Sequence, residues 1–151
     1  MSNVKLHIIL ADDDHDDCFL FDDALKELGI GFELMLVHDG DHLMSHLSGS
    51  PQLPDILFLD LNMPRKTGFE CLSEIKTSDK LKDVPVVIYS TSMDADAANL
   101  LYHKGASLFI RKPNQFSQIK DVLRQSLAFV ERNKIAQPPR DKFIVTTSSG
   151  I

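Results

Sequence analysis

The sequence predicts one α/β domain built on a doubly wound, five-stranded parallel sheet. Five short runs rich in aliphatic and aromatic residues alternate with five stretches of helical periodicity, which is typical of repeated βαβ units. Several of these runs are apolar over nearly their whole length, as expected for strands covered on both faces. Because crossovers between parallel strands are right-handed, we expect the strand order 2-1-3-4-5.

The predicted strands are short, and most end in polar residues. They cover residues 4–11, 32–37, 56–61, 85–90 and 107–111. The predicted helices repeat apolar residues at three- and four-residue steps along one face. They cover about 16–28, 94–104 and 117–132, with two shorter helices whose inner faces are 43–47 and 69–75.

Composition excludes several functional classes. The net charge of −6 argues against general attraction to nucleic acid or to anionic lipid, which needs clustered cations. The apolar runs are far shorter than the roughly 20 residues of a membrane-spanning helix, and the N-terminus has no signal-peptide pattern. We therefore expect a cytoplasmic protein. Cys18 and Cys71 stand alone in apolar patterns and are expected to be buried, reduced thiols.

Polar side chains follow four of the predicted strands. Asp12 and Asp13 follow the first strand and Lys112 the fifth, whereas Asp60 is next to last in the third strand and Ser90 is last in the fourth. In the order 2-1-3-4-5 these four strands are neighbours, so their carboxyl ends meet at one rim. A Mg²⁺ ion between Asp13 and Asp60 would relieve the repulsion between the carboxylates. With Lys112 it would make a pocket for a phosphoryl group, with Asp60 as nucleophile.

Four stretches, in this order and at this spacing, resemble the response-regulator receiver domain of two-component signalling. The chain is similar to the stand-alone type, as in the chemotaxis response regulator, with its flavodoxin-like (βα)5 fold. The resemblance covers about residues 4–132. The matching stretches are IILADDD at 8–14, LDLNMP at 59–64 with Gly68 following, VIYST at 87–91, and IRKP at 110–113.

The resemblance implies a role for each residue of the rim. Asp60 would accept a phosphoryl group from the phosphohistidine of a sensor histidine kinase or a phosphotransfer protein. Asp13 and Asp60 would bind Mg²⁺ together with the backbone carbonyl of Asn62, with Asp12 beside the metal as an outer ligand. Lys112 would pair with the phosphate.

The resemblance also implies how the switch would work. Ser90 would hydrogen-bond to the phosphate, and Phe109 would turn inward when that hydroxyl moves. The family commonly has Thr and Tyr at these two positions, so Phe109 lacks a hydroxyl with which to report the switch. We expect the face of residues 95–109 to be the output surface. The resemblance further implies a cis peptide at Lys112-Pro113.

Three features of the sequence bear on other functions. A Mg²⁺-dependent phosphatase or phosphotransferase using Asp60 as nucleophile is the alternative, but such enzymes commonly carry a second Asp where this chain has Asn62. A flavin-binding protein is disfavoured because the acidic loop after the first strand would repel a phosphate. His42 and His46 lie four residues apart on a helix, but a solvated face is expected there rather than a metal site.

The chain is expected to divide into a receiver domain, 1–132, and a tail, 133–151, with no separate effector domain. The tail is too short for a DNA-binding module, so output is expected through contacts with a downstream protein. The stretch 143–147 has β propensity. It is predicted either to pair as a strand or to pack on another subunit in a homodimer, the alternative being a disordered terminus.

Overall fold

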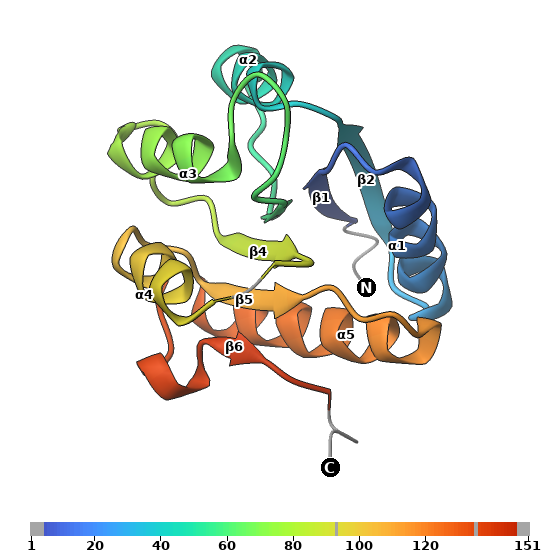
Figure 1. The fold of residues 1–151 in the computed structure, drawn as a ribbon. Helices are drawn as coiled ribbons and strands as arrows, with labels where there is room; N and C mark the ends of the chain where they lie inside the picture. Colours follow the sequence, from blue (N-terminus) through green and yellow to red (C-terminus); the bar gives the residue numbers. More distant parts are fainter. Residues whose placement is uncertain (1–4, 93, 135, 148–151) are drawn as a thin grey trace.

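The computed structural model describes residues 5–92, 94–134 and 136–147, which form a central sheet between two layers of helices (Figure 1). All strand pairs are parallel, in the order β2-β1-β3-β4-β5-β6. The strands are β1 (Leu6–Ala11), β2 (Phe32–Val37), β3 (Ile56–Leu59), β4 (Val86–Ser90), β5 (Leu108–Arg111) and β6 (Ile144–Val145).

Five α-helices cover the two faces of this sheet. They are α1 (His15–Glu27), α2 (Gly40–Gly49), α3 (Gly68–Thr77), α4 (Ala95–His103) and α5 (Phe116–Asn133). One core lies between the sheet and α2, α3 and α4, and the other lies between the sheet and the adjacent pair α1 and α5 (Figure 1). Within the described ranges, no helix has the length and apolarity needed to cross a bilayer.

The predicted order of the first five strands is confirmed, and the predicted number of strands is wrong. A sixth strand, β6, extends the sheet beyond β5, with Phe109 opposite Ile144 and Ile110 opposite Val145. It was left out of the predicted sheet because a two-residue strand carries no periodicity, and its stability comes from pairing with a distant strand. The third strand is also shorter than predicted, since β3 ends at Leu59.

The segment 136–147 lies along α4 and the edge of the sheet. The Tyr102 hydroxyl donates to the Pro138 carbonyl at 2.7 Å, and a short 3-10 helix, η1 (Arg140–Lys142), leads into Phe143. The Phe143 side chain is fully buried, with its ring against those of Tyr102 and Phe109. Of the predictions for this stretch, pairing as a strand is the one that the fold confirms.

Candidate functional site

The predicted rim is formed by the carboxyl ends of β1, β3, β4 and β5. Two backbone hydrogen bonds continue the sheet into the acidic residues: Asp12 N–H donates to the Val37 carbonyl at 2.9 Å, and Asp60 N–H donates to the Ala11 carbonyl at 2.9 Å. The strands therefore fix the backbone on which both carboxylates stand. Asp12 and Asp60 are buried at 0% and 5% exposure, whereas Asp13 faces solvent.

Asp12, Asp13 and Asp60 converge into one cluster. Each offers a carboxylate oxygen, and these oxygens lie within 4.8 Å of one another. One oxygen of Asp12, Oδ2, is buried, and the Lys112 ammonium lies 2.7 Å from it. Hard oxygen ligands at this spacing, one of them open to solvent, fit a divalent cation such as Mg²⁺ that keeps several waters.

The Lys112 side chain reaches this cluster from the end of β5. The side chain is 7% exposed, and its ammonium lies 2.7 Å from Asp12 Oδ2, 2.8 Å from Asp17 Oδ2 and 3.4 Å from Asp60 Oδ2. The Lys112 N–H donates to the Ser90 carbonyl, so the pairing of β5 with β4 holds the lysine backbone at the rim. Of the predicted site residues, Asp12, Asp13, Asp60 and Lys112 are thus brought together.

Burial and charge oppose each other in this cluster. Burial raises the pKa of Asp12 to about 6, against the lowering effect of Lys112. Burial also disfavours the charged form of Lys112, but its bonds to Asp12 and Asp17 outweigh that cost and hold its pKa above the usual value. Lys112 is therefore a fixed positive charge among an excess of carboxylates, which leaves the cluster able to bind a further cation.

Close packing holds the loop between β3 and α3. Gly68 N–H donates to the Leu61 carbonyl at 3.0 Å, and a Cβ at Gly68 would overlap the Asp60 carbonyl oxygen and lie 2.8 Å from Leu61 Cα. Thr67 and Glu70 then form a capping box that begins α3. This loop includes Asn62, which is exposed and whose N–H lies 3.5 Å from Asp60 Oδ1.

The two predicted switch residues, Ser90 and Phe109, are both fully buried. Ser90 ends β4, and its hydroxyl accepts from Ser92 N–H at 3.4 Å. Phe109 lies on β5 with its ring turned into the core, 6.4 Å from the ring of Phe143. The tail therefore contacts the predicted switch residue directly.

The structure adds two residues that the sequence did not place at the rim, Asp17 and His38. Asp17, in the first turn of α1, is a closer partner of Lys112 than Asp60 is. His38 follows β2 and places Nδ1 2.9 Å from the Asp12 carbonyl oxygen, with its ring in a tilted contact with that of His15. The spacing of Asp14 and Asp17 along α1 separates their roles, because Asp14 caps the helix and its carboxylate accepts from Asp17 N–H.

The structure also bears on the His42 and His46 pair and on the peptide bond between Lys112 and Pro113. Among the residues placed by the structure, Asp12, Asp13 and Asp60 are the only group of three acidic, histidine or cysteine side chains close enough to share an ion, so His42 and His46 lack a third ligand. The backbone between 5 and 147 shows no cis peptide at the described positions, so the cis bond implied at Lys112-Pro113 is not found.

The fold is a doubly wound α/β domain, and an acidic rim with one buried lysine lies at the carboxyl ends of its strands. The comparisons identify the family: the chain belongs to the response regulator receiver domains, whose family model matches residues 8–124. Receiver domains act in two-component signalling, bind a divalent metal, and interact with histidine kinases or phosphotransfer proteins.

Relatives share most of their length with this chain. The response regulator Rcp1 of Synechocystis is 33% identical over 124 residues, which is 78% of this chain and 84% of Rcp1. The probable methanogenesis regulatory protein FilR2 of Methanothrix harundinacea is 31% identical over 122 residues, 78% of this chain and 79% of FilR2.

Two solved structures are similar in both sequence and fold. The phosphorylated cyanobacterial phytochrome response regulator RcpA has a TM-score of 0.74 and 31% identity, covering 88% of this chain and 96% of RcpA. The Mn²⁺-bound form of Rcp1 has a TM-score of 0.72 and 30% identity, covering 78% of this chain and 91% of that one.

Proposed function

We propose that this chain is a phosphorylation switch in which Asp60 accepts a phosphoryl group from a phosphohistidine on a sensor kinase or phosphotransfer protein. The observation that carries the proposal is the cluster at the rim, where the Asp60 carboxylate lies 3.4 Å from the buried Lys112 ammonium and beside Asp12 and Asp13. A nucleophilic carboxylate next to a fixed cation is the arrangement that phosphoryl transfer requires.

In the transfer, a carboxylate oxygen of Asp60 attacks the phosphorus of the phosphohistidine. The P–N bond breaks, its electron pair returns to the imidazole of the donor, and an acyl phosphate forms on Asp60. Lys112 balances the negative charge that this adds to the rim. A Mg²⁺ ion held by Asp13, Asp60 and the Asn62 carbonyl would stabilise charge on the phosphoryl oxygens, with Asp12 as an outer ligand.

The buried hydroxyl of Ser90 and the ring of Phe109 are the residues proposed to read out the phosphoryl group. Phosphorylation adds about −1.5 to −2 charge and three strong acceptors at the rim. Ser90 would donate to one of these acceptors, and the end of β4 would move with it. Phe109, on the adjacent strand β5, would repack in turn, provided that the two arrangements differ little in free energy.

The output is proposed to go through contacts with another protein. We assign the described part of the tail to the receiver domain rather than to a separate effector, because residues 136–147 pack on α4 and pair with β5. We place this activity in the cytoplasm, where ATP-dependent kinases become phosphorylated.

The test is incubation with acetyl phosphate and Mg²⁺ followed by intact-protein mass spectrometry. The chain should gain one phosphoryl group, and Asp60→Ala should gain none. Asp23→Ala is the matched control, because Asp23 is an exposed carboxylate on α1. Its gain should equal that of the parent chain. No gain in the parent, or an undiminished gain in Asp60→Ala, would overturn the proposal.

A further inference from the structure

The segment 136–147 packs against one face of helix α4, and the opposite face is left uncovered. Arg140 Nε donates to Asn99 Oδ1 at 2.7 Å, and the Gln137 side-chain amide donates to the carbonyls of Tyr102 and Ala106. The segment 136–147 therefore occupies part of the face 95–109 that was expected to be the output surface. A partner protein that binds α4 therefore has to contact the face that the tail leaves open.

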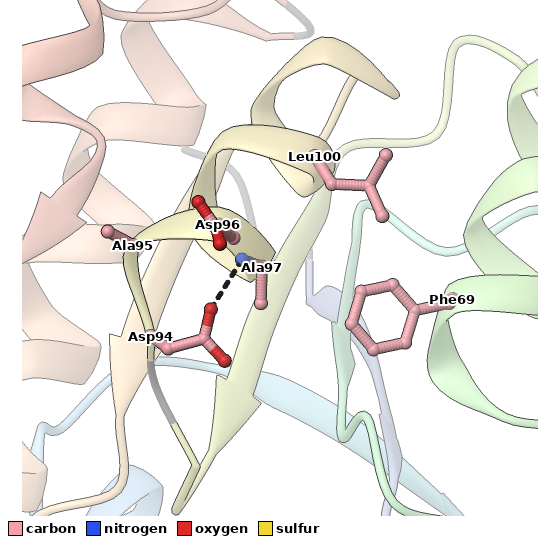
Figure 2. A pocket seen from close by; sticks show the side chains of 6 residues that line it. All are labelled: Phe69, Asp94, Ala95, Asp96, Ala97 and Leu100. Atoms are coloured by element: carbon pink, nitrogen blue, oxygen red, sulfur yellow. Dashed lines mark hydrogen bonds between the residues drawn. The ribbon is translucent and has the colours of Figure 1, made fainter.

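The other side of α4 faces α3 across an open groove of about 500 Å³, which we call the α3–α4 groove. Its lining is Phe69, Asp94, Ala95, Asp96, Ala97 and Leu100. Figure 2 shows the ring of Phe69 and the side chain of Leu100 facing each other across the gap. Leu100 is 47% exposed and lines this groove together with the partly buried Phe69.

Carboxylates stand at the end of the α3–α4 groove where α4 begins. Asp94 caps the helix by accepting from Ala97 N–H at 2.8 Å, and Asp96 is exposed in the first turn (Figure 2). No cation in the described part of the chain forms an ion pair with either residue; on the flanking elements, Lys66 pairs with Glu74, and Lys104 at the other end of α4 donates to Ser73. The groove is thus apolar along its walls and acidic at one end.

We propose that the α3–α4 groove binds an amphipathic helix of a partner protein, with a large apolar residue inserted between Phe69 and Leu100 and a Lys or Arg facing Asp94 and Asp96. Helices commonly bind by laying an apolar face into a hydrophobic groove, and a flanking cation fixes their direction. This rests on the proposed function in that it names the surface through which the switch would act.

Charge favours this occupant over two others. An anionic membrane would be repelled by Asp94 and Asp96. A second copy of the chain is disfavoured as the occupant. Its exposed apolar residues on α1, Phe19 and Leu20, are surrounded by acidic side chains, and these would be repelled by the carboxylates at the acidic end of the groove. A basic amphipathic helix satisfies both the apolar walls and the unpaired carboxylates.

The probe is a basic helical peptide of about 16 residues with leucines at i, i+4 and i+7 and lysines on one flank. A second peptide replaces the lysines by glutamates. Binding to the full, unphosphorylated chain is followed by NMR, because backbone amides report the location as well as the affinity. Shifts should centre on Phe69, Ala97 and Leu100, and the glutamate peptide should bind about tenfold more weakly at low salt.

Single substitutions test which residues of the α3–α4 groove contribute to the affinity for the lysine peptide. Leu100→Ala should weaken the lysine peptide about tenfold, whereas Leu20→Ala, a leucine of similar exposure on α1, should leave the affinity within about twofold. Asp96→Asn should weaken it about threefold and reduce its salt dependence. Shifts centred on α1, an effect of Leu20→Ala equal to that of Leu100→Ala, or equal binding of the two peptides would overturn the proposal.

The same titration on Asp60→Ala separates this inference from the proposed function. Because the groove exists without a phosphoryl group, the peptide should bind Asp60→Ala as it binds the parent chain. Binding at the groove together with a failure of acetyl phosphate to modify Asp60 would leave the groove standing and remove the phosphorylation switch. Phosphorylation of Asp60 together with absence of groove binding would remove the groove alone.

Discussion

Replacing Phe143 by alanine should destabilise the domain by about 3 kcal/mol, although the residue lies in the tail. Its side chain is fully buried and its ring centroid lies 5.2 Å from that of Tyr102 and 6.4 Å from that of Phe109, both at edge-to-face angles. Burying such a side chain contributes about 1.5–3 kcal/mol, and aromatic pairs add about 0.5–1.5 kcal/mol. Phe→Ala substitutions in cores cost about 3–5 kcal/mol.

The assay is equilibrium unfolding in urea followed by circular dichroism, with Phe19→Ala as the matched control. Phe19 is 70% exposed on α1, so its removal should change the free energy of unfolding by less than about 0.5 kcal/mol. Hydrogen exchange at Phe109 gives a second reading, because the Phe109 N–H donates to the Phe143 carbonyl at 3.0 Å. Loosening of the tail should accelerate exchange at that amide.

The unfolding and exchange measurements together show whether Phe143 contributes to the stability of the domain. A loss near 3 kcal/mol shows that the tail folds as part of the domain. A smaller loss with fast exchange at Phe109 would show that the tail detaches locally before the domain unfolds. A loss below about 1 kcal/mol with unchanged exchange would refute the reasoning, since Phe143 would then contribute little to the core.

Two further substitutions test the site. Asp17→Asn removes one of the carboxylates that hold the Lys112 ammonium, so the ammonium is freer to pair with a phosphoryl group. At saturating Mg²⁺ the variant should therefore bind the phosphoryl mimic beryllofluoride about fivefold more tightly than the parent chain. That factor is equivalent to about 1 kcal/mol, as expected for a partly exposed ion pair. Asp16→Asn makes the same change in charge without that contact and should have a smaller effect; equal gains would contradict the role of the contact. Gly68→Ala should cost about 1–3 kcal/mol in urea unfolding because its Cβ overlaps backbone, whereas Gly49→Ala, with open space around it, should be neutral or stabilising. Equal stability of these two variants would show that the loop after β3 tolerates a side chain.

The sequence was sufficient to predict the elements whose pattern is local. Apolar runs and helical periodicity are properties of a few consecutive residues, and the right-handed crossover rule converts them into the order 2-1-3-4-5. The carboxyl ends of parallel strands meet at one rim, so the prediction that Asp12, Asp60 and Lys112 converge needed no coordinates.

The tertiary structure decided what depends on contacts between distant segments. β6 forms because Ile144 and Val145 pair with the free edge of β5; the β propensity of 143–147 allowed a strand but did not identify its partner. Asp17 reaches Lys112, 95 positions away, because the rotation of α1 on the sheet aims it there while Asp16 faces solvent. The tail covers one side of α4, which leaves Leu100 and Phe69 on the other. These outcomes follow from packing geometry, which a linear pattern of residue types does not contain.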